Sequence, residues 1–347
     1  MKVYKYRYGS KRDLDSLEQD YFYVPHPSSL NDPFENLFDE NQIYKILDQI
    51  EKILEKSTSN IQQQLKDLCQ RIRTKIGIFS LSKTERDELL WSYYADSHRG
   101  FCIEYDLEKL TELNKITASF DIDYKEKIPN INLETIIAKG DQAMSELLRK
   151  TSGGKSISWN HEKEFRICIE PYGNYEYDYR AVKAIYFGLR MPKKEKDLLV
   201  DNEKLPDYLS KFSQEKLMEA LKGRGIKYYQ MLLKPNSYDF GYIEVEDLYM
   251  DVPKYKSHIK PLDKSLIDYN GYGWSIEPRY FDKVAEIICR EPYYYKLNSI
   301  HVSKEQSISR NEPIIFAGFF KAENDWSQIK KYLTLSEIDQ IYNRLDI

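Results

Sequence analysis

The sequence is poor in cysteine and has no long apolar run. Its 347 residues include four cysteines, which lie far apart and form no Cys-x-x-Cys pair. This spacing fits neither a zinc site nor a disulfide framework, so we expect reduced thiols in a protein core. No stretch of 18 apolar residues occurs, and the opening MKVYKYRYGS has charges without an apolar segment behind them. We therefore expect no membrane span, no signal peptide and a cytoplasmic location.

An excess of charge of one sign is also absent. The chain has 52 basic and 56 acidic residues, a formal net charge of −4. Such a balance gives no overall positive field to hold nucleic acid nonspecifically, although a local basic groove stays open as an alternative. The motifs HExxH, GxSxG, Walker A and GxGxxG do not occur. Their absence excludes the metalloproteases, esterases, P-loop NTPases and dinucleotide-binding folds that carry them.

Strand and helix patterns follow one another along the chain without a regular βαβ alternation. Alternating or short apolar runs predict strands over residues 3–8, 21–24, 76–81, 101–105, 165–169, 182–187 and 227–233. Three- and four-residue spacing predicts a helical hairpin over 42–73 broken near 57–60, and further helices over 89–94, 133–148 and 326–345. Ser82 or Thr84 is the expected N-cap of the helix over 89–94. This mixture predicts an α+β fold, a mainly antiparallel or mixed sheet with flanking helices.

The strand and helix rhythm weakens after Tyr242, where aromatic and turn residues increase. We therefore predict a core domain over residues 1–240 and an aromatic-rich C-terminal extension over 241–347, with the boundary near 235–245.

Two segments near the start of the chain could line a site. In Tyr4-Lys5-Tyr6-Arg7, strand alternation places Lys5 and Arg7 on one side, and an arginine can fork onto a phosphate. An edge-strand charge is the alternative. In the sequence NDPFE, Asn31 and Asp32 lie in a loop fixed by a proline, and an Asx turn explains them equally well.

Two later segments also combine aromatic and charged residues. The stretch LWSYYADSHRGF carries Trp91, Tyr94 and Arg99 near the end of a helix, where capping is the alternative explanation for the arginine. In the stretch SWNHEKEFR, three charged residues are expected on one face at the start of a strand, with an aromatic residue just upstream. These residues are Trp159, Glu162, Glu164 and Arg166. They form either a pocket rim or an ordinary solvated face.

Together these segments resemble a bacterial family defined as a domain of unknown function, DUF2971. The likeness rests on YKYR, NDPFE, LWSYYADSHRGFCIEYD and WNHEKEFR, and it spans about residues 1–235. The resemblance implies a related fold and a set of candidate pocket residues, but it does not imply a particular reaction.

A more distant likeness suggests chemistry, because the order of a strand arginine, an aromatic second strand and a late Glu-x-Glu is similar to that of ADP-ribosyltransferases. The resemblance implies that NAD is the substrate and that Arg7 contacts its phosphates. It further implies that Tyr23 or a neighbouring aromatic covers the nicotinamide, Glu164 holds a ribose hydroxyl and Glu162 orients the acceptor. A fixed carboxylate suits this reaction because breaking the nicotinamide–ribose bond builds an oxocarbenium-like cation. The resemblance does not say whether the acceptor is a protein, a nucleic acid or water. A role as a toxin or phage-defence effector is a further expectation. The mapping departs from the family where Val24 stands in place of a strand serine.

Two alternatives to this chemistry are open. Asp32, Glu35, Glu162 and Glu164 could bind Mg²⁺ in a metal-dependent nuclease, although Arg166 stands where a lysine base would be expected. A non-enzymatic binding or sensor module is the other, because tyrosine and tryptophan favour interfaces as well as pockets.

Overall fold

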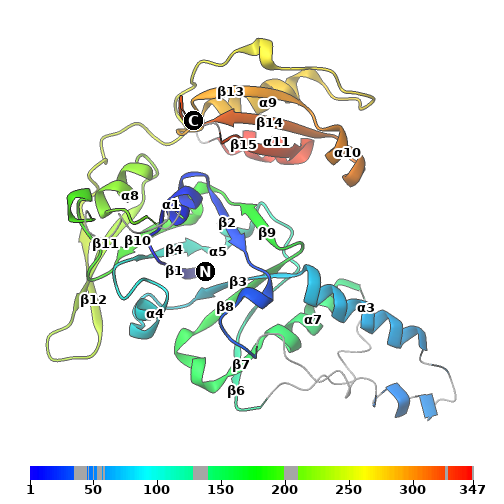
Figure 1. Cartoon of the computed structure of the whole chain (residues 1–347), viewed down its shortest axis with the longest axis vertical. Helices are drawn as coiled ribbons and strands as arrows, with labels where there is room; N and C mark the ends of the chain where they lie inside the picture. The colour runs from blue at the N-terminus through cyan, green and yellow to red at the C-terminus, as the bar shows by residue number, and fades with distance from the viewer. Residues whose placement is uncertain are drawn as a thin grey trace. The chain divides into compact units, whose positions relative to one another are not determined.

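The computed structural model describes residues 1–34, 45, 47–49, 51–52, 57, 59–127, 140–198, 210–324 and 327–345. Its main element is an eight-stranded sheet with the order β12-β11-β10-β4-β1-β3-β8-β5 (Figure 1). Every neighbouring pair is antiparallel except β10 and β11. The predicted α+β class with a mainly antiparallel sheet is confirmed.

The strands of this sheet agree closely with the sequence pattern. In spatial order they are β12 (Phe240–Val245), β11 (Lys227–Leu233), β10 (Val182–Phe187), β4 (Phe101–Asp106), β1 (Lys2–Arg7), β3 (Gly77–Ser82), β8 (Glu164–Ile169) and β5 (Ala118–Asp121). Two small sheets flank it, one formed by β2 (Tyr21–Val24) and β9 (Gly173–Glu176), the other by β6 (Asp123–Lys125) and β7 (Gly154–Ser156).

Helices and 3-10 turns lie between these strands in the chain. They are α1 (Lys11–Glu18), α3 (Ser59–Lys75), α4 (Glu88–Tyr93), α5 (Leu107–Thr111), α7 (Gly140–Ser152) and α8 (Gln214–Ala220), with 3-10 turns η1 (Pro27–Ser29), η2 (Ile157–Glu162), η3 (Tyr179–Ala181) and η4 (Glu195–Leu198). Asp87 caps α4 through the Leu89 and Leu90 amides, so the prediction of Ser82 or Thr84 as its cap was wrong. Most of the first arm of the predicted hairpin, and residues 133–139 of the predicted third helix, lie outside the described residues.

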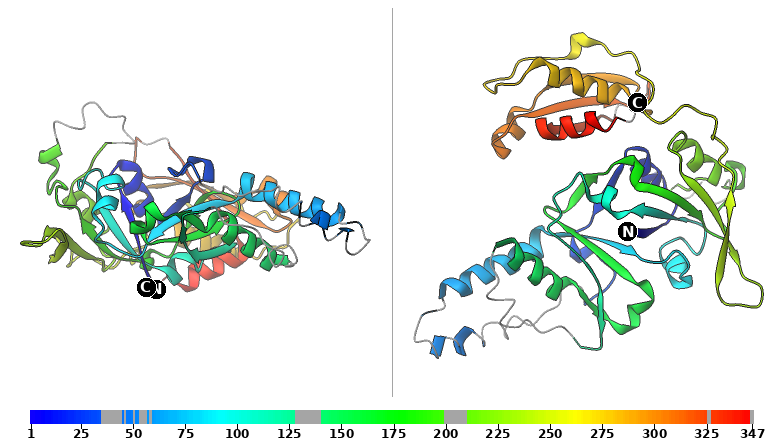
Figure 2. Two further views of the ribbon diagram at one scale, coloured as in Figure 1. Left: turned by 90° about the horizontal axis from the view of Figure 1, so that it is seen from below. Right: turned by 180° about the vertical axis from the view of Figure 1, so that it is seen from behind.

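Two apolar clusters attach helices to this sheet. Helices α3 and α7 lie side by side near β5, where Ile72 and Leu148 are fully buried with Ile78 of β3 (Figure 2). Helix α4 packs its Leu90 and Trp91 against another part of the sheet. Trp91 is 0% exposed, and its indole N–H donates to the Glu85 carbonyl at 2.8 Å. Burying an aromatic ring of this size fixes α4 firmly on the sheet, and with it the turn that leads into β4.

A glycine allows β1 and β4 to approach closely where α4 leads into β4. A Cβ on Gly100 would lie 2.1 Å from the Arg7 carbonyl oxygen, which no side chain tolerates. The three residues Asp96, Ser97 and His98 before it have φ angles of 47°, 52° and 70°. The tight turn between α4 and β4 therefore depends on left-handed backbone and on a missing side chain.

The sheet is narrowly joined between β1 and β3. Tyr4 lies opposite Ser82, and no further pair forms between these two described strands. An antiparallel ladder would continue with Tyr6 opposite Ser80. Instead, the Lys5 ammonium donates to the Ser80 carbonyl at 2.6 Å. The two strands separate at this point, and the separation creates space within the sheet.

The chain divides into two compact units, residues 1–221 with 226–248, and residues 222–225 with 249–347. The second unit contains a three-stranded antiparallel sheet of β13 (Lys296–Val302), β14 (Ile314–Phe320) and β15 (Ile329–Thr334). Its helical elements are η7 (Lys264–Leu266), α9 (Pro278–Cys289), α10 (Lys304–Arg310) and α11 (Leu335–Asn343). The prediction of a single helix over 326–345 was wrong, because its first apolar residues belong to β15. The spacing of Ile329, Tyr332 and Leu333 fits a helix locally, but β14 beside them provides a strand partner.

The cysteines are reduced and buried, as the sequence predicts. Cys69, Cys102, Cys168 and Cys289 are all buried thiols. In the part of the chain that the structure describes, none of the helices combines the length and apolar character needed to cross a bilayer.

Candidate functional site

A pocket of about 420 Å³ opens where β1 and β3 separate. Residues from β1, α1, the loop after η1, β3, α4, β7, η2 and β8 line it, all within the first unit. The lining side chains that carry charge are Lys5, Arg7, Arg12, Asp13, Lys155, Glu162, Glu164 and Arg166. The volume is in the range of small-molecule sites. Five basic against three acidic groups favour an anionic ligand.

Two glutamates reach the pocket from either side of a tight turn. The sequence pattern placed both glutamates at the start of one strand. In the structure only Glu164 lies there, as the first residue of β8, whereas Glu162 is the last residue of η2. Lys163 between them has φ 44°, which turns the chain so that both carboxylates line the same cavity. The Ser82 hydroxyl anchors the turn by donating to the Glu162 carbonyl at 2.8 Å.

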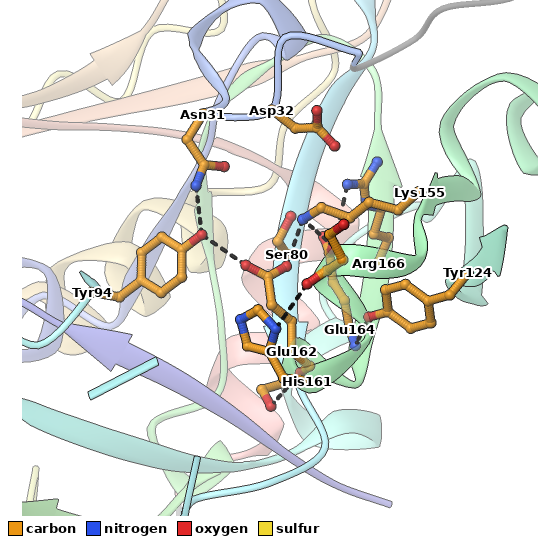
Figure 3. A network of polar contacts seen from close by, with 12 residues as sticks. Asn31, Asp32, Ser80, Tyr94, Tyr124, Lys155, His161, Glu162, Glu164 and Arg166 are labelled. Atoms are coloured by element: carbon orange, nitrogen blue, oxygen red, sulfur yellow. Dashed lines mark hydrogen bonds and ion pairs between the residues drawn. The ribbon is translucent and has the colours of Figure 1, made fainter. Parts of the chain in front are cut away.

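Lys155 bridges the two carboxylates (Figure 3). Its ammonium lies 2.5 Å from Glu162 Oε2 and 3.0 Å from Glu164 Oε2. All three side chains are buried, and the ammonium also lies 4.9 Å from the centre of the Trp159 ring. Burial alone would lower the pKa of Lys155, but the two carboxylates outweigh it and raise that pKa, so the lysine stays charged.

Arg166 holds Glu164 from the other side. Its Nε donates to Glu164 Oε1 at 2.7 Å, and its Nη1 donates to the Ser152 carbonyl at 2.6 Å. Arg166 is 1% exposed. Burial alone would raise the pKa of Glu164, but Arg166 and Lys155 outweigh it and lower that pKa to about 2. Glu164 is therefore an ionised, fixed carboxylate at any physiological pH.

Tyr94 and Asn31 extend the network to the pocket rim. The Tyr94 hydroxyl donates to Glu162 Oε1 at 2.8 Å and accepts from Asn31 Nδ2 at 2.6 Å (Figure 3). Burial and the nearby Glu162 raise the pKa of Tyr94, so its hydroxyl keeps its proton and acts as a donor. On the opposite side, the Tyr124 hydroxyl accepts from the Glu164 amide at 2.8 Å.

The structure brings six of the predicted site residues to this pocket. They are Arg7, Asn31, Tyr94, Glu162, Glu164 and Arg166. Arg7 and Glu164, from distant parts of the sequence, line the same cavity.

The other predicted residues are not in the described lining of the pocket. Trp91 belongs to the core under α4, Tyr23 is 51% exposed on β2, and Arg99 is exposed in the turn before β4. Asp32 is buried and accepts from the Phe34 amide in its own turn. Trp159 contacts the site through the Lys155 ammonium. Glu35 lies outside the described residues.

Sequence reasoning missed several pocket residues, above all Lys155, Ser80 and Ser82. A lysine on a three-residue strand has no pattern that distinguishes it from a surface lysine. The sequence did indicate Lys5 as a possible pocket residue, because the Tyr-Lys-Tyr-Arg alternation places its side chain on the same side of the strand as that of Arg7.

Acid should destabilise the protein through Glu164. Its pKa is lowered in the folded state, so its stabilisation is present above the unfolded value near 4.5 and is lost as the pH falls from there towards 2. The full loss is on the order of 3 kcal/mol, of which about 2 kcal/mol should appear between pH 6 and pH 3. Urea unfolding at pH 6, 4.5 and 3 measures it, with Glu164→Gln as the comparison. An equally steep acid loss in both proteins would contradict this assignment.

Residues 90–167 match the model of a family described as "Protein of unknown function (DUF2971)". The match begins in α4 and ends in β8, so it includes Tyr94, Lys155, Glu162, Glu164 and Arg166 of the pocket. The predicted resemblance to this family is thus confirmed over these residues. Searches of curated proteins and of solved structures gave no match.

Proposed function

We propose that the protein consumes NAD as an ADP-ribosyltransferase-like enzyme, with the pocket between β1 and β3 as its active site. The observation that carries the proposal is that Arg7 and Glu164 line one cavity. The cavity has an excess of basic groups at its β1 side and two ionisable carboxylates at its β8 side. NAD has the matching parts, an anionic diphosphate and a ribose whose hydroxyls can donate to a carboxylate.

In this proposal each charged group has one role. Arg7 binds the diphosphate, because a guanidinium forks onto phosphate oxygens. Glu164 accepts a hydrogen bond from a ribose hydroxyl, which shares the carboxylate with its present donors Arg166, Lys155 and Ser80. Glu162 lies beside Tyr94 and orients the acceptor.

The bond that breaks joins the nicotinamide nitrogen to C1′ of the ribose. Its electron pair leaves with nicotinamide, and positive charge spreads over C1′ and the ring oxygen. A nucleophilic acceptor then forms a new bond to C1′ and gives up a proton. Preorganised carboxylates stabilise such a developing cation better than water does, because their orientation is fixed before the reaction. Lys155 and Arg166 fix Glu164 in this way.

The metal-dependent alternative has less support from the geometry. The Lys155 ammonium lies between Glu162 and Glu164, the position that a bridging Mg²⁺ would need. Within the described ranges, no group of three or more His, Cys, Asp or Glu side chains is placed to hold a metal. The binding-module alternative and the toxin or phage-defence role stay predictions.

The proposal is tested by incubating the purified chain with NAD and measuring free nicotinamide by chromatography. We expect nicotinamide to accumulate in proportion to protein, and NAD to raise the melting temperature because it binds the folded state. A melting temperature that rises with Mg²⁺ or Mn²⁺, with no nicotinamide formed, would instead favour the nuclease. The absence of both effects would favour the binding module.

A further inference from the structure

Lys5 occupies an unusual position in the sheet. Its side chain extends from β1 into the space between β1 and β3, where its ammonium donates to the Ser80 carbonyl at 2.6 Å. The same ammonium lies 4.8 Å from the centre of the Phe79 ring. Both Lys5 and Ser80 line the pocket. The Lys5 ammonium therefore lines the cavity at the point where β1 and β3 separate.

Arg7 lies on the same side of β1 as Lys5. Its nearest acidic partner is Asp13, 3.8 Å from Nη1, and this pair is long for an ion pair. The buried Nε of Arg7 has no hydrogen-bond partner in the described structure. Asp13 accepts hydrogen bonds from the Gly9 and Ser10 amides, so its charge is shared with the start of α1. The Arg7 guanidinium thus retains unused donor capacity beside the cavity.

At the other end of the pocket the charges are balanced. Glu162 and Glu164 are paired with Lys155 and Arg166. The excess positive charge is therefore concentrated at the β1 side, where Lys5, Arg7 and Arg12 line the cavity with a single carboxylate, that of Asp13. Only an anionic group would balance it.

We propose that Lys5 and Arg7 form a subsite for a phosphate or diphosphate group, and that binding at this subsite requires the charged form of Lys5. The identity of the ligand as an NAD fragment rests on the proposed function. The subsite itself rests on the geometry of β1.

The surroundings of Lys5 make its charge sensitive to pH. Burial, and then the neighbouring Arg7, lower the pKa of Lys5 to about 7. Opposing charges come from Glu164 of β8, Glu162 of η2 and Asp13 of α1. The pocket also contains Arg12 of α1, Lys155 of β7, Arg166 of β8 and the Tyr94 hydroxyl beside α4. A bound diphosphate adds negative charge beside Lys5 and raises its pKa, so binding above pH 7 takes up a proton.

The test is calorimetric binding of ADP-ribose to the full chain at pH 6 and pH 8. ADP-ribose is suitable because its diphosphate does not titrate in this range, unlike a phosphate monoester with its second pKa of about 6. We expect affinity about tenfold weaker at pH 8 than at pH 6, following a group with a pKa near 7. Repeating the titration at pH 8 in buffers of different ionisation enthalpy should show uptake of about one proton.

Variants separate a binding role from a structural one. Lys5→Arg keeps the charge but cannot titrate, so its affinity should be the same at both pH values. Lys5→Gln should bind weakly at both. Lys211→Arg is the matched control, because burial also lowers the pKa of Lys211, to about 8, and its ammonium contacts the carbonyl of the pocket residue Tyr8. This variant should retain the wild-type pH dependence.

The outcomes for the subsite and for the enzyme are distinct. A pH-independent affinity in the wild type, a pH dependence unchanged in Lys5→Arg, or no binding of ADP-ribose at all would overturn the subsite. If ADP-ribose binds with the expected pH dependence while NAD releases no nicotinamide, the subsite stands and the proposed reaction falls.

Discussion

Glu164→Gln should lower the rate of nicotinamide release from NAD by about 10²–10³-fold, the loss typical of removing one preorganised electrostatic contact in an active site. Glutamine preserves the shape of the side chain but removes the charge that faces the developing cation. It also removes the ion pairs with Lys155 and Arg166 that fix the carboxylate. Steady-state rates of nicotinamide release at saturating NAD measure the effect.

A control must show that the loss is not simply a loss of folding. Glu104→Gln is suited to this, because Glu104 is a buried glutamate on β4 of the same sheet, paired with Lys2 and Tyr186, and is outside the described pocket lining. This variant should keep the wild-type rate per folded molecule. If Glu164→Gln is folded and turns over NAD at the wild-type rate, the assignment of Glu164 is wrong even where the reaction class is right.

Arg166→Met should destabilise the fold by about 3–5 kcal/mol, the usual cost of breaking a buried ion pair from one side. Arg166 is almost completely buried, and its removal would leave Glu164 and the Ser152 carbonyl without their guanidinium donor. Methionine fills much of the same volume, so the loss reports the missing charge more than a cavity. Urea unfolding followed by circular dichroism gives the free energy.

The matched comparison is Arg71→Met. Arg71 also forks onto a glutamate, Glu170, at 2.6–2.8 Å, but its side chain is 55% exposed. Exposed ion pairs contribute about 1 kcal/mol or less, so this variant should lose much less stability. Similar losses in the two variants would show that burial does not set the strength of the Arg166 pair. A double variant with Glu164→Gln should lose less than the sum of the two single changes, because both act on one pair.

The sheet was largely predictable because its strands have short-range patterns. Strands β2, β10 and β11 begin and end where the apolar runs predict them. The C-terminal helix was mispredicted because Ile329 and Leu333 fit a helix as well as a strand, and only pairing with β14 decides between them. Tertiary partners of this kind cannot be read from local spacing.

Part of the pocket could be predicted from short segments of the sequence. Arg7 and the two glutamates belong to segments whose mixture of charge and aromatic residues is unusual enough to notice. Trp91 was assigned to ligand binding by proximity to such a segment, whereas its size and 0% exposure make it a core residue. Lys155 was missed because its role depends on a fold that places it between two carboxylates.

The single pair that joins β1 to β3 has a mechanical consequence. Five strands lie on one side of this joint and three on the other, and Tyr4 with Ser82 is the backbone pair that connects them. A ligand bound between Arg7 and Glu164 would contact the strands on both sides of the β1–β3 pair and would link the two parts of the sheet. We therefore expect the sheet to be stiffer with the ligand bound than without it.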